Sequence, residues 1–299
     1  MHWKIKAYTQ FVLAHVPGGE RINYQLQQIS KSHTPEKYRG RITGLTSMIA
    51  KHLEVEGKVI VEIGTGWDAV VSILLFWMGA AAVYTYDHVR HVRFALVKMF
   101  LAEMPDLVGE VSRATSIPEA VLRERFDRLA AAQDLDTLFR AAGIRYYAPA
   151  DATRTGLPDH SVDVVCSYAV LEHVPESVID GITAEAKRIL KPGGVAFHSI
   201  GLQDHFVSFD PSITTVNFLQ CPEWWWRIFV KHKIQYLNRL RRNEYLKLFQ
   251  AHGARVEVKE FTINPGDLAA LKTMKVDRRF EGMALEELAV TKLVVGMTF

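Results

Sequence analysis

The feature that most constrains the fold is a short glycine turn between two apolar runs of different character. Residues 58–63 are β-branched and predict a strand, residues 68–78 predict a buried helix, and Glu62-x-Gly64-x-Gly66 joins the two. Glycines at such a point let the backbone turn sharply and approach a bound ligand at the helix N-terminus. The turn therefore predicts the first half of a β-α-β unit with a nucleotide-type binding edge.

The alternation of strands and helices continues along the chain. Further strands are predicted at Ala82–Tyr86, Ile144–Tyr147, Val162–Ser167, Val195–Ile200, Arg255–Ile263 and Leu288–Met297. Helical patterns are predicted at Arg90–Ala142 with a capped restart at Ser116–Glu119, at Glu176–Leu190 before the stop Lys191–Gly194, and at Arg239–His252. This rhythm predicts an α/β fold with a Rossmann-like, seven-stranded, mainly parallel sheet, helices on both faces and additional helical lid segments.

The 299 residues are expected to form one domain, since 48% are hydrophobic and 23% are charged, as in ordinary globular proteins. Four parts are predicted within it: an N-terminal lid at 1–50, a binding core at 55–200, an inserted lid or acceptor segment at 201–238, and a helix with the last two strands at 239–299.

The net charge and the N-terminal sequence argue against nucleic-acid-binding, membrane-spanning and secreted proteins. A net charge of +3 is too small to predict a nucleic-acid partner. The run at 69–80 is too short to span a bilayer, and no signal peptide is evident, so we expect no membrane span and a cytoplasmic location. Cys166 and Cys221 are expected to be free thiols. The oligomeric state stays open.

Two further carboxylates follow predicted strands. Asp87 ends the second strand, where a carboxylate can accept hydrogen bonds from both ribose hydroxyls of a nucleotide-type ligand. Asp151 follows the third strand, where it can accept from an adenine amino group. Each one alone is equally well explained as a helix cap or turn residue. With Glu62 they place three carboxylates at three strand ends of one sheet edge.

The order of these motifs resembles a known family. Residues 151–174 (Asp-Ala-Thr-Arg-Thr-Gly-Leu-Pro-Asp-His-Ser-Val-Asp through Leu-Glu-His-Val) and 186–194 (Ala-Lys-Arg-Ile-Leu-Lys-Pro-Gly-Gly) are similar to a signature block of small-molecule class I S-adenosylmethionine-dependent methyltransferases. The likeness is greatest to the group that includes ubiquinone- and menaquinone-pathway enzymes, and it covers about residues 55–200.

The resemblance implies a set of donor-binding residues. The methionine end of S-adenosylmethionine would meet Glu62, Gly64 and Gly66, the ribose Asp87, the adenine Asp151 and Ala152, and the methionine amino group the backbone of Ser167. The chain departs from the family at Asp68, which stands where a third glycine is usual, and at the neighbouring Trp67. Asp68 either caps the following helix or accompanies a wider loop.

Two histidines are candidates for the acceptor side. His173 lies in the Leu-Glu-His-Val segment and His205 just after the fifth strand. An imidazole can deprotonate a hydroxyl near neutral pH. His205 is the preferred base and Asp204 beside it has no assigned role, because adjacent residues of an extended chain point to opposite sides. A structural role for each histidine is the alternative.

Aromatic and basic residues gather in the last third of the chain. Trp224–Trp226 either wall an apolar acceptor pocket or pack a lid onto the body. Lys231–Lys233 and Arg239 with Arg241 and Arg242 form either a solvated helix face or a clamp for an anionic acceptor.

The resemblance implies methyl transfer from S-adenosylmethionine to a small molecule, with S-adenosylhomocysteine as the product. Aromatic and anionic acceptors both fit. Oxygen is the favoured acceptor atom because of the two histidines, while nitrogen and carbon stay open, and no metal-ligand spacing is evident. An NAD-type Rossmann oxidoreductase and a catalytically silent donor-binding protein are the alternatives from other classes.

Overall fold

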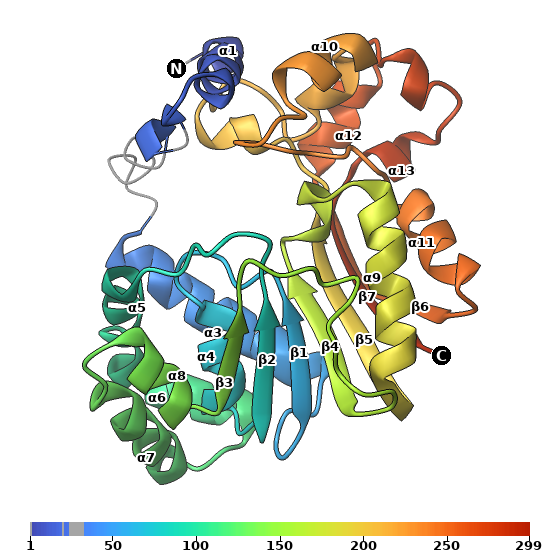
Figure 1. Ribbon diagram of the computed structural model, residues 1–299. Helices are drawn as coiled ribbons and strands as arrows, with labels where there is room; N and C mark the ends of the chain where they lie inside the picture. The colour runs from blue at the N-terminus through green and yellow to red at the C-terminus, as the bar shows by residue number, and fades with distance from the viewer. Residues whose placement is uncertain (1, 20, 24–32) are drawn as a thin grey trace. The chain divides into compact units, whose positions relative to one another are not determined.

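A seven-stranded sheet organises the chain, and the computed structural model describes residues 2–19, 21–23 and 33–299 (Figure 1). The strands are β1 (Val59–Ile63), β2 (Ala82–Tyr86), β3 (Ile144–Tyr147), β4 (Val162–Tyr168), β5 (Leu190–Gly201), β6 (Arg255–Ile263) and β7 (Val290–Thr298). Their order is β3-β2-β1-β4-β5-β7-β6. The sheet is mixed and mostly parallel, which confirms the predicted Rossmann-like α/β class.

The strand order creates a switch point beside β1. From this strand the chain builds outward through β2 and β3 on one side and through β4 and β5 on the other. Such a reversal opens a crevice at the carboxyl ends of the strands, where α/β sheets bind ligands. The parallel registers align these ends, since Ile63 lies opposite Tyr86 and Ser167, and Tyr86 lies opposite Tyr147.

Helices occupy most of the remaining described residues. The α-helices are α1 (Trp3–His15), α3 (Pro35–His52), α4 (Val70–Trp77), α5 (Phe94–Leu101), α6 (Met104–Thr115), α7 (Glu119–Ala130), α8 (Leu135–Ala141), α9 (Glu176–Ile189), α10 (Glu223–Phe229), α11 (Arg242–Ala251), α12 (Pro265–Leu271) and α13 (Leu285–Leu288). Short 3-10 helices are η1 (Leu171–His173), η2 (His205–Ser208), η3 (Asn217–Gln220) and η4 (Arg278–Phe280).

The chain divides into two compact units. The glycine-loop unit, named after Gly64 and Gly66, comprises the described residues of Lys31–Tyr168, Ile182–Phe197 and Thr298–Phe299. The histidine unit, named after His173 and His205, comprises the described residues of Met1–Ser30, Ala169–Gly181 and His198–Met297.

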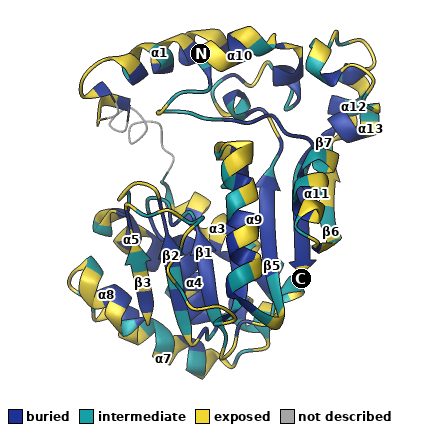
Figure 2. Cartoon of the chain, turned by 45° about the vertical axis from the view of Figure 1, so that its right-hand side comes forward, coloured by how far each residue is buried: buried dark blue, intermediate teal, exposed yellow. Residues whose placement is uncertain are grey.

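Helix α4 forms the most apolar part of the glycine-loop unit. All of its residues are buried, as Figure 2 shows by its dark blue ribbon. The indole N–H of Trp77, its last residue, donates to the Leu122 carbonyl oxygen at 2.8 Å, so the polar atom of that buried ring is satisfied. In the part of the chain that the structure describes, no helix is both long enough and apolar enough to cross a bilayer.

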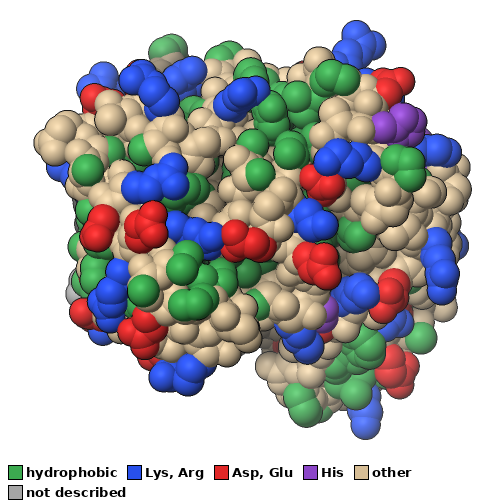
Figure 3. Space-filling view, turned by 90° about the horizontal axis from the view of Figure 1, so that it is seen from below, with side chains coloured by type: hydrophobic (Ala, Val, Ile, Leu, Met, Phe, Trp, Pro, Cys, Tyr) green, Lys and Arg blue, Asp and Glu red, His purple; other side chains and the backbone are tan. Residues whose placement is uncertain are grey.

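Charged side chains of both signs are dispersed over the face of the protein that Figure 3 shows. On the face seen in Figure 3, basic and acidic groups alternate without an extended patch of one sign. Several form ion pairs, such as Arg188 with Asp159 at 2.5 Å and Lys191 with Asp163 at 2.9 Å. This pattern accords with the small net charge of +3.

Two predicted boundaries in the middle of the chain are wrong. The helical stretch 90–142 holds four separate helices, α5 to α8, and Ser116 ends α6 instead of capping α7. Its N–H closes the last turn of α6 by donating to the Ser112 carbonyl at 2.8 Å, and its φ of 60° turns the chain away. Strand β5 begins at Leu190, so the predicted stop Lys191–Gly194 lies within that strand.

Candidate functional site

The turn after β1 carries both of its glycines in the left-handed region, with φ of 84° at Gly64 and 70° at Gly66. Side chains disfavour this region because Cβ crowds the following carbonyl. The Gly64 N–H donates to the Tyr86 carbonyl at 2.8 Å, and the Gly66 N–H donates to the Asp87 carboxylate at 3.1 Å. The glycine loop is therefore fastened to the end of β2.

Glu62 lies fully buried beneath this loop. Its carboxylate accepts hydrogen bonds from the hydroxyls of Ser72 on α4 and Thr85 on β2, the second at 2.8 Å. Thr85 also bonds the Thr65 hydroxyl at 2.6 Å, within the loop itself. Burial raises the pKa of Glu62 to about 7. This network places Glu62 as the group that holds β1, β2, α4 and the loop together.

Glu62→Gln is expected to reduce the pH dependence of stability. Folded Glu62 keeps its proton up to about pH 7, whereas the unfolded chain releases it near pH 4.5. The folded state thus binds more protons between these values, and the free energy of unfolding falls as pH rises. Between pH 4.5 and 7 the free energy of unfolding of the wild type should fall by on the order of 3 kcal/mol relative to that of the variant, because the glutamine amide of the variant is neutral throughout. Urea unfolding at both pH values measures this, and parallel behaviour of the two proteins would contradict it.

Asp87 lies buried at the end of β2 with an ordered set of donors. Besides the Gly66 N–H, its carboxylate accepts from the Val89 N–H at 3.2 Å, and the His88 imidazole lies 3.2 Å away. Burial opposes ionisation, but hydrogen bonds from His88, Gly66 and Val89 outweigh it and lower the pKa of Asp87 below its usual value. Each carboxylate oxygen has two acceptor positions, so a charged Asp87 can also accept from ligand hydroxyls.

Asp68 does not cap helix α4, although a cap was one of its two predicted roles. Ala69, the residue before that helix, lies in the left-handed region with φ of 49°, and no side chain caps the first turn. Instead the buried Asp68 carboxylate accepts from both terminal nitrogens of Arg41 on α3, at 2.5 and 3.2 Å. Helix α3, from the segment predicted as a lid, is thereby anchored to the glycine loop.

The neighbouring Trp67 stacks on an imidazole at the same end of the sheet. Its ring lies 4.4 Å from that of His91, with an angle of 30° between the planes. The Trp67 carbonyl also accepts from the Arg93 N–H at 2.9 Å. The loops after β1 and β2 are thus joined by an aromatic pair and a hydrogen bond.

The segment after β3 reaches the end of β2 through its backbone. The Ala150 N–H donates to the Asp87 carbonyl at 2.9 Å. Exposed Asp151 folds into a local turn, where one carboxylate oxygen accepts from the Thr153 N–H and hydroxyl at 2.9 and 2.7 Å. Ala152 follows in this turn, and the two local bonds use one of the two Asp151 carboxylate oxygens.

Ser167 completes the predicted donor set from β4. It is buried and lies opposite Ile63, the last residue of β1. The structure brings the seven predicted residues to the carboxyl ends of four neighbouring strands in one unit: Glu62, Gly64, Gly66, Asp87, Asp151, Ala152 and Ser167.

The two predicted histidines lie together in the histidine unit. The rings of His173 and His205 are nearly parallel, with centroids 4.9 Å apart and 13° between their planes. His173 donates from Nδ1 to the Tyr236 carbonyl at 2.9 Å, because a carbonyl can only accept. Glu172, which sequence reasoning did not single out, is buried beside them and accepts from the Gly201 N–H at 3.0 Å. Its signal in the sequence was the Glu-His pair itself.

Asp204 serves the backbone and not the neighbouring histidine. Its carboxylate accepts from the Phe206 N–H at 2.8 Å and from the Asn217 side chain at 3.2 Å, so it caps η2. Burial, with a smaller effect of His173, lowers the pKa of His205 to about 3. The His205 imidazole is therefore neutral at physiological pH.

The basic stretch around Arg239 is buried, so the predicted solvated helix face is wrong for its first two arginines. Helix α11 begins at Arg242, after Arg239 has taken a left-handed φ of 62°. Arg239 is 4% exposed and Arg241 fully buried. The Arg239 guanidinium donates to the Cys221 carbonyl at 2.7 Å and pairs with Glu223.

Arg241 joins three segments of the histidine unit through backbone oxygens. Its guanidinium donates to the carbonyls of Leu202 at 2.9 Å and Leu288 at 3.0 Å, and also to that of Val290. These carbonyls lie after β5 and around the start of β7. The sequence carried no signal for this role, because the partners are 39 to 49 residues away.

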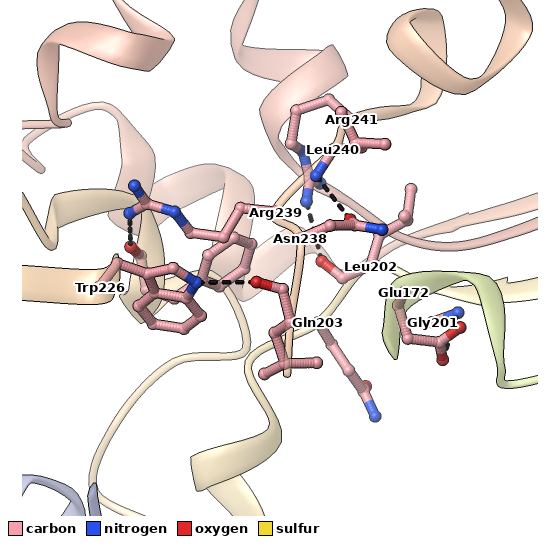
Figure 4. Close-up of a pocket in the computed structure, with 11 residues that line it drawn as sticks. Glu172, Gly201, Leu202, Gln203, Trp226, Asn238, Arg239, Leu240 and Arg241 are labelled. Atoms are coloured by element: carbon pink, nitrogen blue, oxygen red, sulfur yellow. Dashed lines mark hydrogen bonds between the residues drawn. The ribbon is translucent and has the colours of Figure 1, made fainter. Parts of the chain in front are cut away.

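A small cavity lies among these groups (Figure 4). Its volume is about 20 Å³, room for a single water molecule, and its wall includes Glu172, Gly201, Asn238, Arg239 and Arg241. Figure 4 shows the Glu172 side chain beside Gly201, while both guanidiniums reach other parts of the wall. As it stands, the cavity is too small for an acceptor larger than water.

The tryptophan run mainly packs the core of the histidine unit. Trp225 and Trp226 are buried in a cluster with Trp3 and Phe206, whereas Trp224 is 61% exposed. The Trp226 indole donates to the Leu237 carbonyl at 2.9 Å. Of the two predicted roles, packing is the one that these contacts support.

In a comparison with known protein families, one family model matches part of the chain. A model described as a methyltransferase domain matches residues 122–198, which include β3, β4 and α9 and contain Asp151, Ser167 and His173. The match covers less than half of the chain. No curated protein matches it.

Many solved structures match the chain, and two of them illustrate how distant the similarity in fold is. An S-adenosylmethionine-dependent methyltransferase from Mesorhizobium loti is 18% identical, with a TM-score of 0.47, and the match covers 87% of this chain and 99% of that one. The YcgJ protein from Bacillus subtilis is 13% identical, with a TM-score of 0.45 and coverage of 86% and 97%. These likenesses are too distant to bear on activity.

Proposed function

We propose that the chain is an S-adenosylmethionine-dependent methyltransferase that binds its donor at the carboxyl ends of β1 to β4. The observation that carries the proposal is the placement of left-handed Gly64 and Gly66 beside a charged, buried Asp87 at the switch point of the sheet. Sheets of this type bind nucleotide-like ligands at that point. The methyltransferase-domain match over residues 122–198 supports the same class from β3 and β4.

Each predicted residue has a role in this proposal. The loop backbone at Gly64 and Gly66 meets the methionine end, and Asp87 accepts from the ribose hydroxyls. The turn at Asp151 and Ala152 borders the adenine. The backbone at Ser167 meets the methionine amino group. Glu62 acts by holding the loop from beneath, since its carboxylate is occupied by Ser72 and Thr85.

An NAD-type oxidoreductase is the main alternative, because it uses the same turn and the same acidic residue. Two features favour the methyl donor. The block at 151–194 resembles methyltransferases, and the family model that matches this region is a methyltransferase domain. A catalytically silent donor-binding protein would have the same donor-binding residues. Only a measurement of turnover distinguishes it from an enzyme.

The acceptor is proposed to be a small molecule, with oxygen favoured over nitrogen or carbon. The sulfonium is already activated, so the protein has to align the donor methyl with the acceptor and exclude water. A hydroxyl must also lose its proton. His173 and His205 are neutral imidazoles, and Tyr236 fixes the proton of His173 on Nδ1, which leaves Nε2 of that ring as the proton acceptor. Burial lowers the pKa of His205 to about 3, so His205 is the weaker base of the pair.

Replacing either histidine by alanine is expected to lower turnover by about 100-fold, the usual contribution of a general base. The assay follows transfer of a labelled methyl group from S-adenosylmethionine to panels of small phenols, carboxylic acids and amines. His252→Ala is the matched control, because His252 pairs with Asp180 at 2.7 Å and is not a member of the histidine pair. Unchanged turnover would remove that histidine from the proposal. Transfer to no member of any panel would favour the silent alternative.

A further inference from the structure

We propose that Glu172, His173 and His205 bind a divalent transition-metal ion. Their ligand atoms all lie within 4.8 Å of one another. Ligands of one ion at about 2.1 Å are at most about 4.2 Å apart, so small side-chain rotations close the site. Two imidazoles and one carboxylate form a recurrent set for zinc, iron and related ions, which leaves coordination positions open.

Two buried atoms of this cluster lack partners, which indicates a missing ligand. Glu172 Oε2 and His205 Nδ1 have no hydrogen-bond partner, although both are shielded from solvent. Glu172 is 4% exposed, and among the described residues no lysine or arginine forms an ion pair with it. A buried carboxylate without a counter-charge is costly. A bound cation would supply that charge.

The surroundings of the cluster have the features of a metal site. His173 donates Nδ1–H to the Tyr236 carbonyl, which leaves Nε2 as the free nitrogen and fixes the ring. Metal-binding histidines usually have such an outer hydrogen bond. The Gly201 N–H likewise orients the Glu172 carboxylate. His173 is exposed, so an ion can enter from solvent.

Nearby positive charges are directed elsewhere. Arg239 and Arg241 line the cavity that Glu172 borders, yet their guanidiniums bond carbonyls and Glu223. Cys166 and Cys221, the softer ligands, are not part of the cluster. The set therefore suits Zn²⁺, Co²⁺ or Fe²⁺ better than Mg²⁺, which prefers oxygen ligands and retains its waters.

The test is metal binding by the chelator-stripped full-length chain, measured by calorimetry with Zn²⁺ and by the visible spectrum with Co²⁺. We expect a single tight site for which Mg²⁺ does not compete. Glu172→Gln, His173→Gln and His205→Gln should each weaken binding by at least about 100-fold, the upper range for second-shell losses. His252→Gln is the control, since it removes an imidazole that pairs with a carboxylate at 2.7 Å in the same unit.

Binding is measured without donor or acceptor, so its outcome is independent of the proposed methyl transfer. A nitrogen that binds an ion cannot also accept a proton, so for a metal-bound imidazole the ligand role replaces the proposed base role. His173 lies at the surface, so His173→Gln keeps the test decisive if Glu172→Gln does not fold, and circular dichroism checks this. No tight binding by the wild type, binding of Mg²⁺ alone, or equal affinity of the folded His173→Gln variant would each overturn the proposal.

Discussion

Asp87→Ala is expected to weaken binding of S-adenosylhomocysteine by about 100-fold or more. In the proposed complex the charged carboxylate accepts from two ribose hydroxyls, and hydrogen bonds to charged groups contribute roughly 1.5–3 kcal/mol each. Since about 1.4 kcal/mol is a factor of ten in affinity, two such bonds account for this loss. The substitution also removes the acceptor for the Gly66 N–H, which loosens the glycine loop. Calorimetric titration measures the change.

The matched control for this experiment is Asp159→Ala. Asp159 lies in the same unit, but its side chain is 67% exposed and pairs with Arg188 at the surface. Its loss should leave donor affinity unchanged. Asp87→Asn, which keeps one acceptor oxygen, should fall between alanine and the wild type. An Asp87→Ala protein that is folded and binds with wild-type affinity would contradict the assignment of Asp87 to the ribose.

Arg241→Met should destabilise the chain by about 3–5 kcal/mol, because three backbone carbonyls lose their buried donor. Methionine has a similar length but no donors. The carbonyls of Leu202, Leu288 and Val290 would each lose a hydrogen bond inside the histidine unit. Buried unsatisfied carbonyls cost roughly 1–3 kcal/mol apiece, and relief from burying the guanidinium offsets part of this. Urea unfolding measures the difference.

Arg123→Met is the comparison for Arg241. Arg123 is 58% exposed and pairs with Glu119 one helical turn away, an interaction worth about 0.3–0.5 kcal/mol. The two substitutions change the same atoms in different environments. If the Arg241 variant lost no more stability than the Arg123 variant, the hydrogen bonds from Arg241 to the three carbonyls would not stabilise the protein in solution.

Local patterns predicted the sheet well because its strands are short, β-branched and bounded by turns. The limits of β2, β3 and β6 agree with the sequence analysis, and β1 and β4 differ by a single residue. The placement of Gly64, Gly66, Asp87 and Ser167 at strand ends followed from these limits, since parallel strands present their carboxyl ends on one edge.

Contacts between distant segments were outside the reach of local patterns. The sequence suggested Asp68 as a helix cap, yet its carboxylate accepts hydrogen bonds from Arg41, which lies 27 residues earlier. Arg239 and Arg241 looked like a solvated helix face, because charge runs usually lie in water. Their burial depends on carbonyls contributed by other segments. The gathering of Glu172 with His205 likewise depends on η1 and the segment after β5 meeting in the fold.

Calorimetric titration of the wild-type chain with S-adenosylhomocysteine, and in parallel with NAD, distinguishes a methyl-donor site from a dinucleotide site. Both ligands carry an adenosine whose ribose can meet Asp87. They differ in the group beside the glycine loop, which is the methionine part in S-adenosylhomocysteine and the pyrophosphate in NAD. The proposed donor site predicts saturable binding of S-adenosylhomocysteine and none of NAD at the same concentrations. Tight binding of NAD without any response to S-adenosylhomocysteine would mean that the glycine loop serves a dinucleotide and not the methyl donor.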